Sequence, residues 1–225
     1  MRVSAMEGHR QWAPGYDAGL NPLLALETRL LLEKLSPLWP AHFVDIACGT
    51  GRWMALMAGQ CGARVFGLDL CPEMLREASR KPGLGGCLAI ADVCRLPLAS
   101  STADLTLCSF ALGYLASPGE ALAQMARVTR KGGRVVVSDL HPVALAAGWT
   151  RSFRANGESY EIDHHAHSIF DWESAAGDAG LSLEWRLEAA FGEPEREIFR
   201  RAGKEAAFLE LKRTPALLAI SWAKP

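Results

Sequence analysis

The chain has 225 residues, of which 49% are hydrophobic and 22% charged, and its formal net charge is -1. This length predicts a single domain with a sizeable core, and a near-neutral charge disfavours a nucleic-acid partner, because it offers no positive surface for a polyanion. No apolar run approaches the ~20 residues that cross a bilayer, and residues 1–12 lack the apolar centre of a signal peptide. We therefore expect a cytoplasmic protein without a membrane partner, either a monomer or a homodimer.

Six cysteines lie at positions 48, 61, 71, 87, 94 and 108. No two of them have the Cys-x-x-Cys spacing of zinc sites or of thioredoxin-like redox sites. Isolated cysteines within apolar segments are typically reduced and buried. The pattern therefore predicts reduced cysteines and no metal site, and nothing in the spacing points to a catalytic cysteine.

The expected elements alternate between helix and strand. Asn21 and Pro22 form a typical helix start, and Pro37 and Pro40 end that helix. The expected strands are 43–47, 64–69, 87–92, 103–109, 134–139, 181–189 and 216–222, and the expected helices after the first are 52–60, 72–80, 118–128, 171–179 and 194–212. Five strand–helix alternations predict a parallel sheet that is covered on both faces. Residues 1–19 are expected on the surface or as a short lid, and residues 140–168 have no clean period.

Distinctive residues lie at the ends of four expected strands, namely Asp45 to Gly51, Asp69, Asp92 and Ser109 to Tyr114. The loop from Asp45 to Gly51 contains two glycines before a helix start, where unpaired N–H groups can bind a carboxylate or phosphate. Asp69 ends the second strand, where a carboxylate can accept both hydroxyls of a ribose. Asp92 ends the third strand and is placed to accept from an exocyclic amine. In an open parallel sheet these strand ends share one edge, so the pattern predicts a nucleoside site.

The spacing of the loop argues against a dinucleotide. The Gly-x-Gly-x-x-Gly fingerprint requires a third glycine, but Met54 occupies that position when counting starts at Gly49, and Arg52 occupies it when counting starts at Ala47. A nucleoside with a short amino-acid tail fits the loop better. A nucleotide-dependent oxidoreductase stays a remote alternative.

Four stretches together resemble class I S-adenosylmethionine-dependent methyltransferases. They are residues 44–51 (Val-Asp-Ile-Ala-Cys-Gly-Thr-Gly), 67–75 (Gly-Leu-Asp-Leu-Cys-Pro-Glu-Met-Leu), 91–98 (Ala-Asp-Val-Cys-Arg-Leu-Pro-Leu) and 127–137 (Arg-Val-Thr-Arg-Lys-Gly-Gly-Arg-Val-Val-Val). The chain is most similar to the small-molecule enzymes of quinone, biotin and natural-product pathways. The resemblance implies a Rossmann-like, doubly wound α/β sheet of seven strands in the order 3-2-1-4-5-7-6, with strand 7 antiparallel.

The resemblance also implies which residues bind S-adenosylmethionine and its product S-adenosylhomocysteine. The loop would hold the amino-acid end, Asp69 the ribose, and Asp92 with the Val93 backbone the adenine. The implied cofactor residues are Asp45, Ala47, Gly49, Gly51, Asp69, Leu70, Met74, Asp92, Val93 and Ser109, with Tyr16 as a further candidate that closes over the site together with Trp12. Ala47 departs from the family pattern, because many members have glycine there.

The implied organisation is one methyltransferase domain spanning residues 1–225. Residues 1–40 would form a helical segment or lid and residues 41–140 the cofactor-binding core. Residues 141–168 would form an acceptor-side loop, and residues 169–225 would supply the last helices and strands 6 and 7.

Two histidine positions are candidates for a general base. His141 follows the fifth strand, and a histidine pKa near neutrality suits proton transfer; its alternative role is a strand exit with both ring nitrogens satisfied. His165 lies in a cluster with His164 and His167 that can be a solvated loop or can supply one imidazole to the acceptor. Asp163 and Asp171 lie beside these histidines, but adjacent loop residues rarely give the facing geometry of a metal site.

The sequence therefore predicts direct methyl transfer to a small-molecule acceptor, at oxygen or carbon. Residues 109–112 (Ser-Phe-Ala-Leu) lack the acidic or amide residue, two prolines and aromatic that hold an amine in the family's DNA-base enzymes. Tyr114 and Trp149 are candidates for the walls of the acceptor pocket. The alternative is a protein of the same fold that binds the cofactor without transferring methyl.

Overall fold

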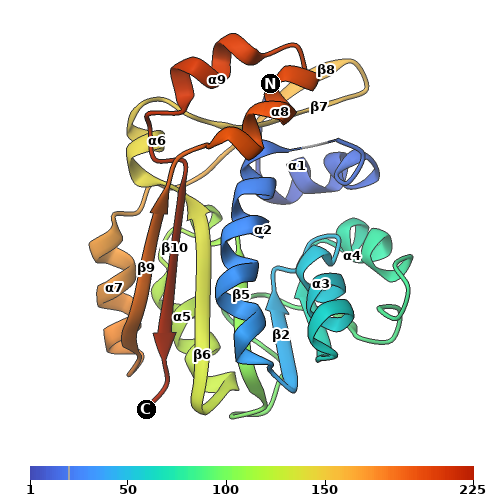
Figure 1. Cartoon of the computed structure of the whole chain (residues 1–225). Helices are drawn as coiled ribbons and strands as arrows, with labels where there is room; N and C mark the ends of the chain where they lie inside the picture. The colour runs from blue at the N-terminus through green and yellow to red at the C-terminus, as the bar shows by residue number, and fades with distance from the viewer. Residues whose placement is uncertain (20) are drawn as a thin grey trace.

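A seven-stranded sheet forms the centre of the computed structural model, which describes residues 1–19 and 21–225 (Figure 1). Its strands in chain order are β2 (His42–Ile46), β3 (Arg64–Asp69), β4 (Leu88–Ile90), β5 (Ala103–Ser109), β6 (Thr129–Leu140), β9 (Ser182–Ala189) and β10 (Leu217–Ala223). They lie in the spatial order β4-β3-β2-β5-β6-β10-β9. The pairs between β4 and β6 are parallel, and β10 runs antiparallel to both neighbours. The predicted order 3-2-1-4-5-7-6, with strand 7 antiparallel, is confirmed.

Helices cover both faces of this sheet, as the apolar central strands require. They are α2 (Pro22–Leu35), α3 (Arg52–Cys61), α4 (Pro72–Ser79), α5 (Gly119–Val128) and α7 (Ile169–Asp178). Helices α5 and α7 pack with one buried cluster of sheet side chains, which includes Val135 and Val137. Helices α2 and α3 pack with the cluster on the other face, which includes Leu105 and Val136. The alternation of β6 valines between the two clusters follows from the two-residue period of a strand.

The helix starts agree with the expected capping chemistry. The Asn21 side-chain oxygen accepts from the Leu23 backbone N–H at 2.9 Å, and Pro22 occupies the first helical position of α2. Predicted helix 194–212 is divided into α8 (Glu193–Arg201) and α9 (Glu205–Leu211), because Gly203 adopts a φ of 67° between them. Residue 20 of the predicted N-terminal segment lies outside the described residues.

A cap of shorter elements lies beyond the carboxyl ends of the parallel strands, at the top of Figure 1. It contains α1 (Ala5–Trp12), α6 (Pro142–Ala146), α8, α9 and a second sheet of β1 (Arg2–Val3), β7 (Arg151–Ala155) and β8 (Glu158–Ile162). The short 3-10 helices are η1 (Ala13–Gly15), η2 (Ser36–Leu38) and η3 (Leu112–Tyr114). The cap therefore combines the N-terminal end of the chain with the segment after β6 and with helices α8 and α9, whereas the C-terminal end lies at the bottom of Figure 1.

The hairpin β7–β8 is an element that the sequence interpretation missed. Ala155 pairs with Glu158, and the two turn residues between them, Asn156 and Gly157, have φ of 52° and 81°. Asn-Gly with both φ values positive is the sequence signature of a two-residue hairpin turn. Segment 141–168 is thus a short helix and a hairpin followed by an irregular stretch, rather than a loop throughout.

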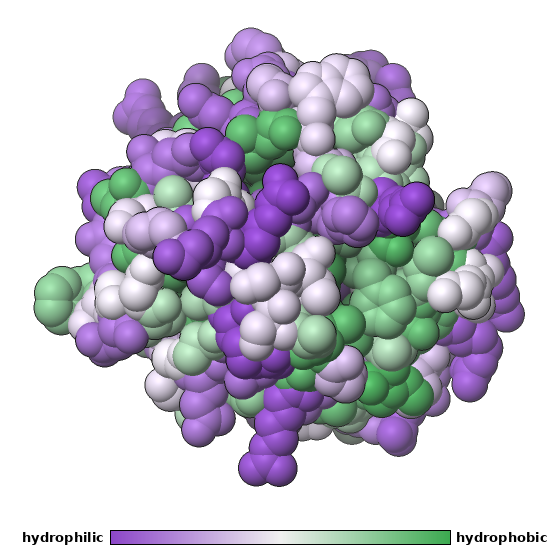
Figure 2. Space-filling view, turned by 90° about the horizontal axis from the view of Figure 1, so that it is seen from below, coloured by the Kyte–Doolittle hydropathy of each residue, from purple (hydrophilic) through white to green (hydrophobic). Residues whose placement is uncertain are grey.

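None of the helices in residues 1–19 and 21–225 is both long enough and apolar enough to cross a membrane. On the face seen from below, apolar side chains gather in one hollowed area to the right, while polar side chains spread over the left and the upper part (Figure 2). The large hydrophobic side chains that are exposed include Trp39 and Phe170.

Candidate cofactor and acceptor site

A cavity of about 550 Å³ lies between the carboxyl ends of the parallel strands and the cap. Strand ends supply one wall through Ala47, Gly49, Asp69, Asp92 and Ser109. The cap supplies the opposite wall through side chains of α1, β7, α8 and α9, together with Tyr16 directly after η1. The cavity therefore lies where ligands of open parallel sheets bind.

The loop after β2 presents its backbone to this cavity. Ala47 and Gly49 have φ of 56° and 55°, and Gly51, which precedes α3, has a φ of 74°. For Ala47 this left-handed conformation costs about 1–2 kcal/mol, and glycine would avoid that cost. A Cβ placed on Gly49 would meet no atom of the described residues within 4 Å. The cavity beside the loop thus has room for a ligand that contacts the backbone closely.

Asp69 connects the loop with the start of α4. Its Oδ2 accepts from the Gly49 N–H at 2.8 Å, and its Oδ1 accepts from the Cys71 N–H at 2.8 Å. Burial raises the pKa of this carboxyl above its usual value, and these backbone N–H groups act in the opposite direction. Each carboxylate oxygen has a second lone pair, so Asp69 can also accept the two hydroxyls of a ribose.

Residues after β3 and β4 line the neighbouring part of the cavity. Leu70, Met74, Asp92 and Val93 all line the cavity. Met74 is buried against η1, in a cluster that contains Tyr16. The Oδ1 of Asp92 accepts from the Cys94 N–H at 2.8 Å, which fixes the carboxyl group at the strand end. An apolar slot next to a fixed carboxylate fits an adenine ring and its exocyclic amine.

Two of the residues that the resemblance assigned to the cofactor lie behind the loop, outside the cavity lining. Asp45 is buried, with its side chain 2% exposed. Burial raises its pKa to about 8, although Arg52 acts in the opposite direction. A Cβ on Gly51 would come within 2.9 Å of Leu84 Cδ1, so this glycine lets the loop pack closely against the segment after α4. Both residues therefore contact other parts of the protein rather than the cavity.

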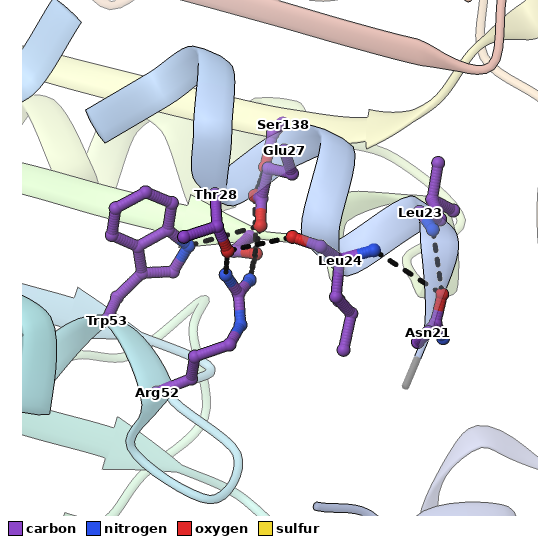
Figure 3. Close-up of polar contacts among 9 residues, drawn as sticks. Asn21, Leu23, Leu24, Glu27, Thr28, Arg52, Trp53 and Ser138 are labelled. Carbon is purple, nitrogen blue, oxygen red and sulfur yellow. Dashed lines mark hydrogen bonds and ion pairs between the residues drawn. The ribbon is translucent and has the colours of Figure 1, made fainter. Parts of the chain in front are cut away.

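Glu27 of α2 accepts hydrogen bonds from residues that directly follow the loop after β2. The sequence interpretation did not single it out. Its buried carboxylate accepts from Trp53 Nε1 at 3.2 Å and Ser109 Oγ at 2.7 Å, and also from Arg52 and Ser138 (Figure 3). These donors belong to α3, β5 and β6. Glu27 therefore connects helix α2 to the start of α3, directly after the loop, and to strands β5 and β6. Ser109 of β5 is also a cavity residue.

The first residues of the chain line the cavity beside the loop after β2. Tyr16 and Trp12 both line the cavity, and their ring centroids lie 4.6 Å apart. Burial raises the pKa of Tyr16 well above its usual value. Asp17 accepts from Thr50 Oγ1 at 2.9 Å and pairs with Lys81 Nζ at 2.8 Å, which connects this segment to the loop.

The other end of the cavity is aromatic and contains one guanidinium. Trp149 and Phe191 stack at 5.9 Å, and Phe199 packs edge-on against Phe191 at 5.2 Å. Arg151 lies 4.6 Å above the ring of Tyr114, its Nη1 donates to the Phe110 carbonyl at 3.0 Å, and its Nη2 pairs with Asp139. All of these residues except Asp139 line the cavity. Sequence reasoning pointed to Tyr114 and Trp149 but to neither Arg151 nor the two phenylalanines.

His141, the first candidate base, lies away from this cavity. It is 2% exposed, and its Nδ1 accepts from the Val143 N–H at 3.1 Å and thereby caps α6. Its Nε2 lies 3.0 Å from Glu188 Oε2. Because the lone pair is used by the cap and the N–H by the carboxylate, the geometry matches the alternative role, a strand exit with a satisfied imidazole.

The second candidate, His165, is also outside the cavity lining. Its backbone N–H donates to the Gly113 carbonyl at 2.7 Å, and its ring stacks on His167 at 6.3 Å. Within the part of the chain that the structure describes, no group of three or more histidine, cysteine or acidic residues could hold a metal ion.

His9 of α1 is a cavity residue that the sequence interpretation did not single out. Its Nδ1 lies 2.7 Å from the Ala5 carbonyl oxygen, and its ring meets that of Tyr114 at 5.1 Å. Burial lowers the pKa of His9, and the charge of Arg151 acts in the same direction, whereas Asp69 and the Ala5 carbonyl raise it. The sequence signal was weak, since His9 reaches the cavity through the packing of α1 on α4 and on the hairpin.

Comparison with known proteins agrees with this geometry. Residues 44–137 match the family model described as a methyltransferase domain. A malonyl-[acyl-carrier protein] O-methyltransferase of Pectobacterium atrosepticum is 31% identical over 209 residues, which are 91% of this chain and 81% of that protein. The chain belongs to the class I S-adenosylmethionine-dependent methyltransferases, and S-adenosylmethionine is its cofactor.

Two further comparisons define the extent of the similarity. A protein of the same description from Pseudescherichia vulneris is 38% identical over 147 residues, but the match spans only 56% of its length. The crystal structure of an S-adenosylmethionine-dependent methyltransferase from Mesorhizobium loti has a TM-score of 0.67 at 24% identity and covers 89% of this chain and 99% of that one. The fold is thus shared over nearly the whole chain.

Proposed function

We propose that this protein transfers a methyl group from S-adenosylmethionine to a small, largely apolar acceptor, at oxygen or carbon. The observation that carries the proposal is one cavity with two distinct ends. The loop after β2, Asp69 and Asp92 line one end, and aromatic side chains line the other. The cofactor supplies a methyl group on a positively charged sulfur. The protein contributes binding and orientation, because holding the reacting groups in alignment lowers the barrier.

Each part of the cavity has a role in this proposal. Asp69 and the loop backbone hold the ribose and the amino-acid end, and Leu70, Met74, Asp92 and Val93 hold the adenine. The aromatic side chains Trp149, Phe191 and Phe199 surround the acceptor, and the segment 141–168 forms its side of the site through Trp149 and Arg151. Trp12 and Tyr16 close the cofactor end and exclude water.

The proposal extends to partners and compartment. All six cysteines are free, and Cys48, Cys71 and Cys108 are buried, which suits a reducing compartment such as the cytoplasm. A chain with a net charge of -1 suits a small-molecule partner rather than nucleic acid, as a monomer or a homodimer.

Calorimetry with S-adenosylmethionine and S-adenosylhomocysteine tests the cofactor site. We expect both to bind, and no binding at millimolar concentration would refute the proposal. Incubation with labelled S-adenosylmethionine and a metabolite extract tests transfer. Label in a small molecule supports the enzyme, whereas binding without any labelled product would favour the alternative, a cofactor-binding protein without activity.

A further inference from the structure

We propose that the imidazole of His9 accepts the proton of the methyl acceptor, and that the acceptor is therefore an apolar molecule with an ionisable hydroxyl, such as a phenol or enol. This inference rests on the proposed function. It concerns His9, whose side chain lines the same cavity as Asp69 and the aromatic end.

Hydrogen bonding fixes which ring nitrogen carries the proton. A carbonyl oxygen can only accept, so the 2.7 Å contact with the Ala5 carbonyl places the proton on Nδ1. In the neutral ring, Nε2 then carries the lone pair. Among the described residues no donor is paired with that Nε2, and the side chain is half-buried at the cavity wall. The tautomer leaves the basic nitrogen accessible to a ligand.

The six histidines of the chain differ in this respect. His141 also has a defined tautomer, but its lone pair accepts from the Val143 N–H. His42 is half-exposed beside Asp104, at the amino end of β2. In the described part of the chain, His9 alone combines a place in the cavity lining with a lone pair that no protein group uses.

The surroundings of His9 match the chemistry of an ionising hydroxyl. The elements packed around it carry charged or titratable groups, which are Asp69 of β3; Cys71, Glu73, Arg76 and Glu77 at and in α4; Tyr114 of η3; Arg151 and Arg154 of β7; and Glu158, Tyr160 and Glu161 of β8. Arg151 lies over one face of the Tyr114 ring, and His9 meets the same ring edge-on. A positive guanidinium close to the proton acceptor favours an anionic oxygen next to it.

The reaction balances with groups already named. The hydroxyl proton moves to Nε2 of His9, and the oxygen lone pair forms the new bond to the methyl carbon. The carbon–sulfur bond breaks, and its electron pair stays on sulfur, which gives S-adenosylhomocysteine. His9 then returns its proton to water when the product leaves. No oxidant or metal enters the balance.

A spectroscopic experiment tests the proposal without methyl transfer. The probe is 4-nitrophenol, whose phenolate absorbs at a longer wavelength than the phenol, added to the protein saturated with S-adenosylhomocysteine at about pH 6.5, near the ordinary pKa of histidine. We expect bound probe to show phenolate absorbance in the wild type and in the control His42→Asn. His9→Ala should lower the phenolate signal of the bound probe about tenfold, as expected when the pKa of the bound probe rises by about one unit, and added imidazole should restore it.

Three results would overturn the proposal. They are a wild-type complex that does not bind or ionise the probe, a His9→Ala variant with an unchanged signal, and a His9→Ala variant that has lost affinity for S-adenosylhomocysteine as strongly as Asp69→Ala. The last result would assign His9 to the cofactor. If the wild type fails to bind S-adenosylhomocysteine in calorimetry, the proposed function fails instead, so the two failures are distinguishable.

Discussion

Replacing Glu27 by glutamine tests whether this carboxylate holds the cofactor loop in place. The side chain is 0% exposed, and its partners come from α3, β5 and β6. Glutamine keeps the shape but turns one acceptor oxygen into an N–H₂ donor. That donor would face either the Arg52 guanidinium or the hydroxyls of Ser109 and Ser138, and the positive charge of Arg52 would lose its counter-ion.

The expected loss follows from the burial of this pair. Breaking a buried ion pair on one side costs about 3–5 kcal/mol. Arg52 is 22% exposed and keeps its contacts with Thr28 and Ser109, so the lower end applies, about 3 kcal/mol. For a chain of this size each kcal/mol lowers the melting temperature by about 2–4 °C, which gives about 6–12 °C.

Urea and thermal unfolding followed by circular dichroism measure this loss. The matched control is Glu33→Gln, which changes an exposed glutamate on the same helix and should alter the free energy of unfolding by no more than about 0.5 kcal/mol. If Glu27→Gln is as stable as Glu33→Gln, the assigned role of Glu27 is refuted.

Three further predictions concern the loop. Asp69→Ala should weaken S-adenosylhomocysteine binding about 100-fold or more in calorimetry, because each hydrogen bond to a charged group contributes about 1.5–3 kcal/mol, and unchanged affinity would contradict the ribose assignment. Burial raises the pKa of Asp45 to about 8, above the ~3.9 of an unfolded chain. The contribution of Asp45 to the free energy of unfolding is therefore fully present below about pH 4 and is lost as pH rises toward 8. Asp45→Asn should remove that loss between pH 5 and 8, and an unaltered pH dependence of the urea midpoint would count against it. Gly51→Ala should lower the free energy of unfolding in urea by about 1–3 kcal/mol more than Gly62→Ala does. Both positions have a positive φ, but only Gly51 would place its Cβ 2.9 Å from Leu84. Equal losses for the two variants would contradict this close approach.

The sheet and the cofactor side of the cavity could be predicted because their signals are local. Strand periods, glycines and the aspartates at strand ends lie within a few residues of each other, and parallel pairing brings the carboxyl ends to one edge. Asp69 and Asp92 therefore line the cavity as expected. The strand order entered through the family resemblance rather than from the period.

The acceptor side could not be predicted in the same way. His141 and His9 are both histidines near a strand end in space, and only the tertiary contacts of their ring nitrogens separate them. Arg151 and Glu27 reach the site from elements whose packing carries no short-range signal. The Asn156-Gly157 turn is a different case, because its hairpin signature was present in the sequence and a search for it would have found β7 and β8.

The pairing of β1 with β8 has a consequence for the order in which the protein matures. The amino group of Met1 donates to the Ser159 carbonyl at 2.9 Å, and Val3 pairs with Ile162. The first residues of the chain thus pair with a segment that is synthesised more than 150 residues later. Contacts between residues so far apart in sequence form slowly. Strands β2 to β6 of the central sheet are synthesised before β8, whereas β9 and β10 follow it. The loop after β2 and Asp69 are therefore present in a nascent chain before the pairing of β1 with β8 can bring the first residues into place.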